Sequence, residues 1–351
     1  MSSLPIRCDI FCAVIDNFGD AGVCWRLARQ LATEFGWNVR LLIDDATALT
    51  WLAPDCNRTT VEVRHFHKTA YTGADVVVEA FACEIPDAYQ VAMTKRALPP
   101  VWLNLEYLSA EAWTSTSHGL ASIHPRLGLN KHFFFPGFGP GCGGLIREQD
   151  YDDRRNQFSA AKFRARLELP HAKPDELSVS LFSYPSAPLA QLYAAWAASS
   201  VPVLAIVPGS SEPPRMTGNL RVVSIPFLSQ LEYDELLWLC DLNFVRGEDS
   251  FVRAQWTAKP MVWQIYPQAE DAHLIKLDSF MTHYLPVGAG NTPLADFWQA
   301  WNNHGALNWQ AFSTQLPQLQ ATAEQWAGKL RQHPDLATNL RDFCLRQLKL
   351  G

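Results

Sequence analysis

Apolar residues are nearly continuous from Ile6 to Ile15, as expected for a strand that is buried on both faces of a sheet. A polar turn of residues 16–22 follows, and apolar residues then recur at helical spacing until Gly36 supplies a stop signal. The next apolar run, Val39–Ile43, predicts a second strand. This order of strand, loop, helix and strand predicts a parallel sheet with helices on its faces.

The same alternation continues along the chain. Apolar runs predict further strands at Val61–Phe66, Ala74–Glu79 and Val101–Leu105. Strands and helices alternate again between Leu177 and Gln264. Two successive α/β halves of similar size predict two facing doubly wound domains, with ligands at the carboxyl ends of the strands in a central cleft.

The domain boundary is expected where the pattern is interrupted. The run FFFPGFGPGCGG at 133–144 cannot continue a helix, and the charged stretch 147–155 is interpreted as a solvated linker, including its Asp150-Tyr151-Asp152 triplet. We therefore expect an N-terminal domain at residues 1–155 and a C-terminal domain at 156–325. A final helical segment, 326–351, is expected to pack back towards the first domain.

Composition narrows the function classes. The formal charge of −6 disfavours a generic nucleic-acid binder, so direct nucleic-acid contact is not expected. No apolar run approaches the roughly 20 residues of a membrane span, and the start of the chain lacks the pattern of a signal peptide. The scattered cysteines, such as Cys8, Cys12 and Cys24, predict buried thiols in a reducing compartment, which indicates a cytoplasmic protein.

The first candidate site is the polar turn after the first strand, which carries Asp16 and Asp20. Two carboxylates there would repel a pyrophosphate, which argues against a nicotinamide-binding domain. One interpretation is that Asp20 only caps the following helix. The other is that the two acids receive a cationic acceptor that loses a proton.

The second candidate site is the turn 246–250, between a predicted strand and a helix. Arg246 beside the free amides of a helix N-terminus would suit a nucleoside diphosphate, although a capped helix with a solvated arginine is an equally simple interpretation. Aromatic and amide side chains at neighbouring strand ends would suit a pyrimidine base, whereas each aromatic alone would suit a core. These side chains are Phe182, Tyr184, Phe227, Gln230 and Tyr233.

Several runs of the sequence carry a resemblance to a known family. The runs are DNFGDAGVCWRLARQL at 16–31, NLEYLSAE at 104–111, RGEDS at 246–250 and FFFPGF at 133–138. They resemble the EarP family, bacterial protein-arginine rhamnosyltransferases that modify translation elongation factor P. The resemblance extends over nearly the whole chain.

The resemblance implies a GT-B glycosyltransferase with two Rossmann-like domains that face a central cleft. It implies that the C-terminal half binds the donor, dTDP-β-L-rhamnose, and that the N-terminal half binds the acceptor protein, elongation factor P. The implied reaction inverts the sugar centre and needs neither a metal nor a further cofactor. The acceptor would be an arginine side chain.

The resemblance also implies roles for individual residues. Asp20 matches the general base, Asp16 supports it, and Glu248 is important for activity. The expected substrate-binding residues fall into the two candidate turns and the strand ends near them. They are Asn17, Phe18, Gly19, Phe182, Tyr184, Phe227, Gln230, Tyr233, Arg246, Asp249 and Ser250.

Three other functions are weighed against this one. A GT-B enzyme with a small-molecule, lipid or cell-wall acceptor would use the same donor pocket, but it would not need the paired aspartates. A non-catalytic protein that binds elongation factor P or a nucleotide sugar would show binding without turnover. A dehydrogenase that uses NAD is disfavoured because the chain has no GxGxxG motif.

Overall fold

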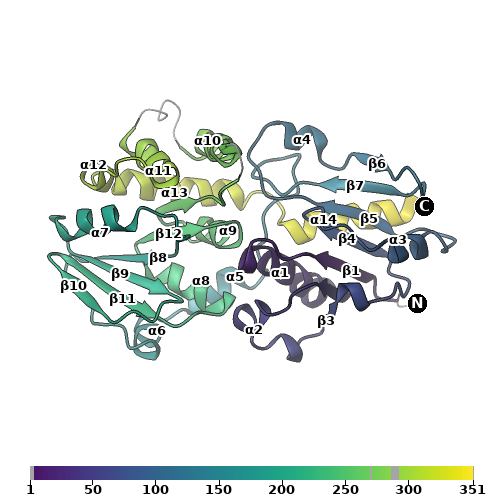
Figure 1. Ribbon diagram of the computed structural model, residues 1–351, viewed down its shortest axis with the longest axis horizontal. Coiled ribbons are helices and arrows are strands. Elements are labelled where there is room, and N and C mark those ends of the chain that lie inside the picture. The colour runs from purple at the N-terminus through teal and green to yellow at the C-terminus, as the bar shows by residue number, and fades with distance from the viewer. Residues whose placement is uncertain (1–3, 269–270, 286–291, 351) are drawn as a thin grey trace. The chain divides into compact units, whose positions relative to one another are not determined.

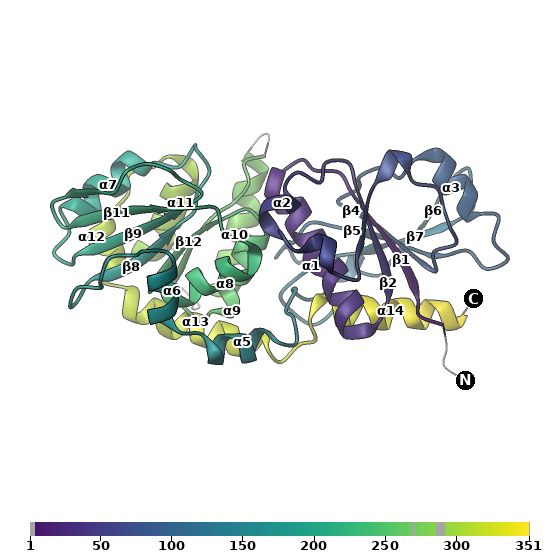
Figure 2. The ribbon, with the colours of Figure 1, turned by 90° about the horizontal axis from the view of Figure 1, so that it is seen from below.

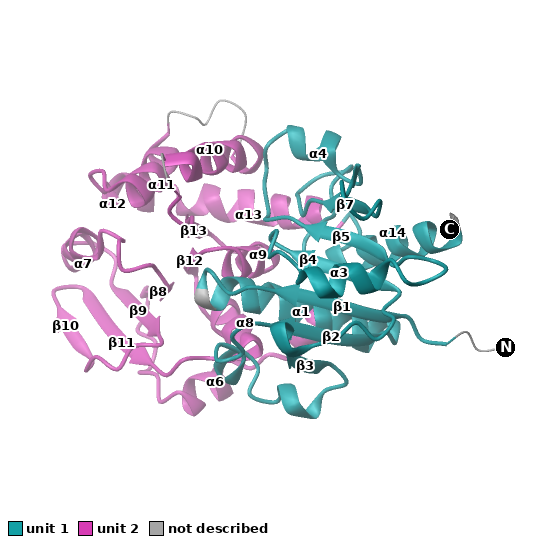
Figure 3. Ribbon diagram, turned by 45° about the vertical axis from the view of Figure 1, so that its right-hand side comes forward, with its two compact units in different colours: residues 1–149, 332–351 teal, residues 150–331 magenta. Residues whose placement is uncertain are grey.

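The computed structural model of the chain describes residues 4–268, 271–285 and 292–350 (Figure 1). The chain forms two compact units (Figure 3). Unit 1 comprises Met1–Gln149 and Gln332–Gly351, and unit 2 comprises Asp150–Arg331. Each unit is built on its own sheet.

The sheet of unit 1 has the strand order β3-β2-β1-β4-β5-β7-β6. Strand β6 runs antiparallel to β7, whereas the other neighbouring strands pair in parallel. The central strands are buried along almost their whole length, which is why their sequences read as unbroken apolar runs. The bounds are β1 Arg7–Cys12, β2 Asn38–Ile43, β3 Glu62–His65, β4 Val76–Ala80, β5 Val101–Leu105, β6 Ala121–Ile123 and β7 Asn130–Phe134.

The longest helix of unit 1 directly follows β1. It ends at Gly36, whose φ of 66° is the left-handed conformation that glycine adopts readily, and whose N–H bonds back to the carbonyl of Leu31. The C-terminal helix α14 packs beside α1 and against β5 (Figure 2). The helices are α1 Asn17–Phe35, α2 Leu49–Leu52, α3 Asp87–Met93, α4 Trp113–Ser117 and α14 Leu336–Leu350, with short 3-10 turns at Cys56–Arg58 and Phe66–Lys68.

The sheet of unit 2 has the strand order β10-β11-β9-β8-β12-β13, with β10 antiparallel to β11 and the other neighbours parallel. Its strands are β8 Leu177–Leu181, β9 Val203–Pro208, β10 Arg215–Thr217, β11 Leu220–Ile225, β12 Leu242–Arg246 and β13 Met261–Gln264. Its helices are α5 Tyr151–Gln157, α6 Ala160–Arg166, α7 Leu189–Ala197, α8 Gln230–Leu239, α9 Asp249–Trp256, α10 Ala272–Tyr284, α11 Pro293–Asn303, α12 Trp309–Ser313 and α13 Leu316–Leu330.

Both units share one strand order. The order is β3-β2-β1-β4-β5 in unit 1 and β11-β9-β8-β12-β13 in unit 2. In each unit the first strand lies in the middle. The next strands are added on one side of it, and the later strands are added on the other side. This is the doubly wound, Rossmann-like arrangement, in which ligands bind where the strand order reverses. The prediction of two α/β domains with parallel sheets is confirmed. The reversal points lie beside β1 and β4 in unit 1 and beside β8 and β12 in unit 2.

The division between the units differs from the expected boundaries at residues 155 and 325. It falls at 149/150 and 331/332 because α5 and α13 both pack into unit 2. Tyr151 of α5 is only 1% exposed, and its hydroxyl accepts a hydrogen bond from the Trp238 indole at 2.8 Å. The stretch 147–155 is therefore not the solvated linker that its charge indicated. In α13, the Trp326 indole donates to Gln255 at 2.7 Å.

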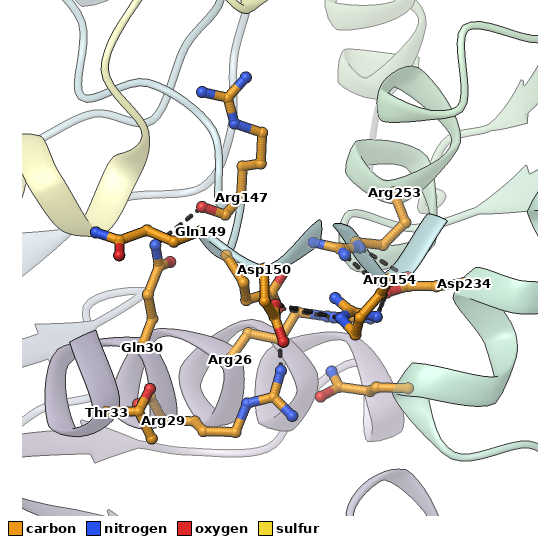
Figure 4. A network of polar contacts seen from close by, with 12 residues as sticks. Arg26, Arg29, Gln30, Thr33, Arg147, Gln149, Asp150, Arg154, Asp234 and Arg253 are labelled. Carbon is orange, nitrogen blue, oxygen red and sulfur yellow. Dashed lines mark hydrogen bonds and ion pairs between the residues drawn. The ribbon is translucent and has the colours of Figure 1, made fainter. Parts of the chain in front are cut away.

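Each unit contains a buried ion pair, and the pair of unit 2, Arg253 with Asp234, is drawn in Figure 4. In unit 1, Arg26 of α1 bonds Glu148 at 3.0 Å, and both side chains are almost fully buried. In unit 2, Arg253 of α9 bonds Asp234 of α8 at 2.7 Å with both side chains fully buried. Removing one partner of such a pair costs about 3–5 kcal/mol, because the other charge stays buried without compensation.

The cysteine side chains behave as the sequence predicts. Cys8, Cys12 and Cys24 are fully buried, and burial raises the pKa of the Cys8 thiol well above its usual range. All eight cysteines are free. Over the part of the chain that the structure describes, the search for a helix long and apolar enough to cross a membrane finds none.

Candidate active site

The acidic turn at the carboxyl end of β1 is organised by Asp20. Its Oδ2 accepts the backbone N–H groups of Ile15 at 2.8 Å and of Asp16 at 2.9 Å. The residue is only 2% exposed. Asp20 lies in the first turn of α1 but is not its N-cap; that position belongs to Asp16, whose side chain makes no capping bond. The simple capping interpretation of Asp20 is therefore wrong, because the side chain fixes the loop before the helix.

Asp16 lies against Gly19. The Gly19 N–H donates to the Asp16 carbonyl at 2.6 Å, and a Cβ atom on Gly19 would stand 2.7 Å from Asp16 Oδ2. Only a residue without a side chain leaves room for the Asp16 carboxylate in this position. The two predicted acids thus belong to one turn, with Asp20 bonded to the backbone of Asp16.

Replacing Gly19 with Ala tests whether the place of the Asp16 carboxylate matters. The new methyl group displaces a flexible side chain rather than backbone, and Ala is favoured over Gly inside a helix by up to about 1 kcal/mol. We expect an unchanged or higher melting temperature with turnover slowed roughly 3- to 10-fold, because the site becomes less preorganised. The control is Gly328→Ala in α13, where a Cβ meets nothing within 4 Å and activity should stay unchanged. Full activity of the Gly19 variant would contradict a role for Asp16.

Asn17 and Phe18, two further residues predicted to bind substrate, lie between Asp16 and Asp20 in the chain. Phe18 is half-buried in the first turn of α1. Asn17 begins α1, but its side chain lies outside the described residues. Their expected contacts with substrate stay predictions.

In unit 2, Arg246 ends β12 and lies against the loop that follows β8. Its guanidinium is 4.1 Å from the centre of the Phe182 ring and 4.8 Å from that of Tyr184, and its Nη1 donates to the Ser183 carbonyl at 2.9 Å. The aromatic faces that the sequence suggested for a base therefore also hold the arginine. Cation–π contacts of this kind contribute about 0.5–2 kcal/mol each.

The turn after Arg246 leads directly into α9. Glu248 is the N-cap of α9 but makes no side-chain capping bond, and it is half-buried. Ser250 does not cap the helix either; its Oγ accepts the Arg246 N–H at 3.0 Å and holds the end of β12. Asp249 accepts a hydrogen bond from the Gln230 amide of α8 at 3.1 Å. The first turn of α9 and the start of α8 are thereby joined.

Tyr233 lies behind this cluster. Its ring centre is 5.6 Å from that of Phe182, and burial raises the pKa of its phenol far above the usual range. The hydroxyl thus stays neutral at working pH and offers a hydrogen bond rather than a charge. Phe227 lies one loop away, beside Gly209, where a Cβ atom would come within 3.2 Å of its ring.

The two groups of side chains offer opposite chemistry. The turn in unit 1 presents a fixed carboxylate, which suits a cation or a group that gives up a proton. The cluster in unit 2 presents a guanidinium beside a helix N-terminus, which suits a phosphate. Aromatic rings next to that guanidinium suit a planar base.

Comparison with known proteins agrees with this chemistry. Residues 8–345 match the family model described as "Elongation-Factor P (EF-P) rhamnosyltransferase EarP". A protein of Pseudomonas putida named "Protein-arginine rhamnosyltransferase" is 44% identical, and the match covers 97% of this chain and 99% of that protein. The chain belongs to the EarP family.

Solved structures place the EarP-family chain among glycosyltransferases. A structure reported as "Structural basis for EarP-mediated arginine glycosylation of translation elongation factor EF-P" is 33% identical, with a TM-score of 0.66, and covers 96% of this chain and 98% of its own. The glycosyltransferase SnogD from Streptomyces nogalater has a TM-score of 0.54 at 12% identity, covering 99% of this chain and all of its own. The second likeness shows the fold alone, which is GT-B. The chain is an enzyme of the protein-arginine rhamnosyltransferase family.

Two residues that sequence reasoning missed hold the turn around Arg246 in unit 2 of this EarP-family chain. Gln264, at the end of β13, accepts the Tyr184 N–H at 2.7 Å, and the neighbouring Trp263 indole donates to the Gly247 carbonyl at 2.7 Å. The sequence pattern that could have pointed to Gln264 is a polar residue at the end of an otherwise apolar predicted strand. In the acidic turn of unit 1, the missed residue is Tyr107, whose hydroxyl donates a hydrogen bond to Asp20.

Proposed function

We propose that this enzyme transfers L-rhamnose from dTDP-β-L-rhamnose to an arginine side chain of translation elongation factor P. The single observation that carries the proposal is the buried Asp20 carboxylate, held by two backbone amides at the end of β1. A rigid acid suits an acceptor that is cationic and must lose a proton. The matching family is described as rhamnosyltransferases of elongation factor P, and the solved relative glycosylates an arginine of that factor.

The acceptor chemistry requires such an acid. A guanidinium has a pKa above about 12 and is a poor nucleophile while its charge is delocalised. A carboxylate that bonds one nitrogen localises the charge away from the attacking nitrogen and accepts the proton as the new bond forms. Asp20 takes this role in the proposal, and Asp16 adds a second negative charge to hold the cation.

The donor chemistry requires positive charge at the leaving group. As the bond between the anomeric carbon and the phosphate oxygen breaks, the electron pair leaves with dTDP. Arg246 and the first amides of α9 stabilise this charge, so we propose that transfer proceeds without a metal or further cofactor. In this proposal the thymine is surrounded by the aromatic rings of Phe182, Tyr184 and Tyr233. The diphosphate and the sugar are oriented by Gln230, Asp249 and Ser250. Phe227 completes the donor pocket, and Glu248 orients the sugar or the arginine.

Attack from the face opposite the leaving group inverts the sugar centre. Asn17, Phe18 and Gly19 line the acceptor side of the reaction in this proposal, since they belong to the turn that carries both acids. The free cysteine thiols suit a reducing compartment, and we propose that the enzyme acts in the cytoplasm.

The direct test incubates the purified enzyme with dTDP-β-L-rhamnose, elongation factor P and an excess of EDTA. We expect intact-mass analysis to show the gain of one deoxyhexose, and fragmentation to locate it on an arginine. Loss of activity in EDTA that Mg²⁺ restores would contradict the metal-free step. No mass gain with folded partner, together with transfer to a small-molecule acceptor, would favour the GT-B alternative. Binding without turnover would favour the non-catalytic one.

A further inference from the structure

The two oxygens of the Asp20 carboxylate are not equivalent. Oδ2 accepts two backbone N–H groups, from Ile15 at 2.8 Å and from Asp16 at 2.9 Å. A carboxylate oxygen has two lone-pair positions, so Oδ2 is saturated. Oδ1 accepts one hydrogen bond among the described residues, from the Tyr107 hydroxyl at 3.3 Å. The oxygen with capacity for a further proton is therefore Oδ1.

Tyr107 is itself held by the loop after the adjacent strand β4. Its ring stacks on Phe81 with the ring centres 4.2 Å apart and an angle of 12° between the planes. Phe81 has a φ of 57° and Ala82 a φ of 53°, a left-handed conformation that is strained for a residue with a side chain. Such strain persists only where the surroundings enforce it.

Strand β5 enforces this conformation. The Phe81 N–H donates to the Leu105 carbonyl at 2.7 Å, and the Ala82 N–H donates to the Asn104 side-chain oxygen at 3.1 Å. Tyr107 follows the same strand two residues after Leu105. Loops from β1, β4 and β5 thus converge on Asp20, at the edge where the strand order of unit 1 reverses.

We infer that Phe81 and Tyr107 form a positioning pair that fixes Asp20 with its Oδ1 as the oxygen that receives the acceptor proton. The inference rests on the proposed role of Asp20 as the base. Tyr107 is a positioning residue, because it acts on the carboxylate rather than on the sugar or the arginine. Its hydroxyl occupies one lone pair of Oδ1 and leaves the other for the substrate.

The proton step balances within this arrangement. An N–H bond of the acceptor guanidinium breaks, and its proton moves to Asp20 Oδ1. The freed electron pair forms the bond to the anomeric carbon, while the bond from that carbon to the phosphate oxygen breaks and its pair leaves with dTDP. The product arginine keeps its positive charge, and Asp20 then releases the proton to water.

The test is the Tyr107→Phe variant, assayed with saturating donor and elongation factor P. We expect kcat to fall roughly 5- to 20-fold, the size of one lost hydrogen bond to a charged group, with the donor KM within about twofold of its original value. Placing Tyr107→Phe in an Asp20→Asn background should lower the residual rate no further, because the two residues act as one unit. An unchanged kcat, or independent additive losses, would overturn the inference.

Two further comparisons separate positioning from folding. Tyr89→Phe removes a buried tyrosine hydroxyl from a different carboxylate, Asp9, and should lower the melting temperature without changing kcat. Phe81→Leu should reduce kcat in the same direction as Tyr107→Phe, while Phe81→Tyr, which keeps a stacking ring, should restore it. Equal kcat losses in the Tyr89 and Tyr107 variants would assign Tyr107 a structural role only. The proposed function fails separately, if the unmodified enzyme itself gives no turnover.

Discussion

Replacing Asp20 with Asn should lower the turnover of arginine rhamnosylation roughly 10²- to 10⁴-fold, the usual contribution of general acid–base catalysis. The variant can keep its fold, since the Asn oxygen can accept the N–H groups of Ile15 and Asp16. The amide NH₂ then stands where Oδ1 stood and cannot take a proton. Stopped assays with mass detection measure the rate, and calorimetry measures the affinity for dTDP, which should not change.

Two companion variants control for charge and for folding. Asp45→Asn removes an exposed acid that follows the next strand, β2, where it accepts the Thr47 N–H at 2.8 Å, and it should retain full turnover. Asp20→Ala leaves the two amides without a partner and should also lower the stability by about 1–3 kcal/mol. Substantial turnover by Asp20→Asn would remove Asp20 as the base.

Replacing Arg246 with Ala should lower kcat/KM for the donor roughly 10²- to 10³-fold, the range found when one donor to a developing negative charge is removed. The side chain lies between the Phe182 and Tyr184 rings and the Ser183 carbonyl, so its loss removes both the charge and the packing of the loop after β8. Lysine should restore little, because an ammonium group lacks the planar fork of a guanidinium. Initial rates at varied donor concentration and the Kd of dTDP measure the effect.

The matched control is Arg215→Ala. Arg215 also lies over a tyrosine ring, 4.6 Å from the centre of Tyr193, but it belongs to β10 at the far edge of the sheet of unit 2. We expect this variant to bind dTDP as tightly as the unmodified enzyme. If the two variants weaken the binding of dTDP equally, the effect comes from the loss of positive charge in general. Arg246 would then have no specific role in binding the donor.

The strands of this protein could be predicted because burial on both sheet faces leaves an unmistakable pattern. Val101–Leu105 is apolar at all positions but one, and β5 has these same bounds. Local charge was a poorer guide. The acidic and basic residues around Tyr151 indicated a solvated linker, whereas one buried aromatic ring anchors α5 in unit 2. The contact between Tyr151 and Trp238, which are far apart in the sequence, decides where α5 packs. The periodicity of the sequence cannot reveal such a contact.

The sequence predicts which residues of the candidate site follow the ends of strands. It does not predict which side chains contact one another there. The position of Asp16 and Asp20 after β1 follows from the sequence, because the strand and helix around them are strongly patterned. The bond from Tyr107 to Asp20 depends on a left-handed turn at Phe81, a residue whose type gives no sign of that conformation. Arg246 was expected to hold phosphate, but its contact with two aromatic rings depends on how β8 and β12 pair.

The central claim is that unit 2 binds the nucleotide and that the acids of unit 1 serve the acceptor. A crystal structure of the enzyme with bound dTDP tests it most directly. We expect the diphosphate at Arg246 and the first turn of α9, with the thymine beside Phe182 and Tyr184. Density for dTDP against the turn between Gly19 and Gly22 would contradict it.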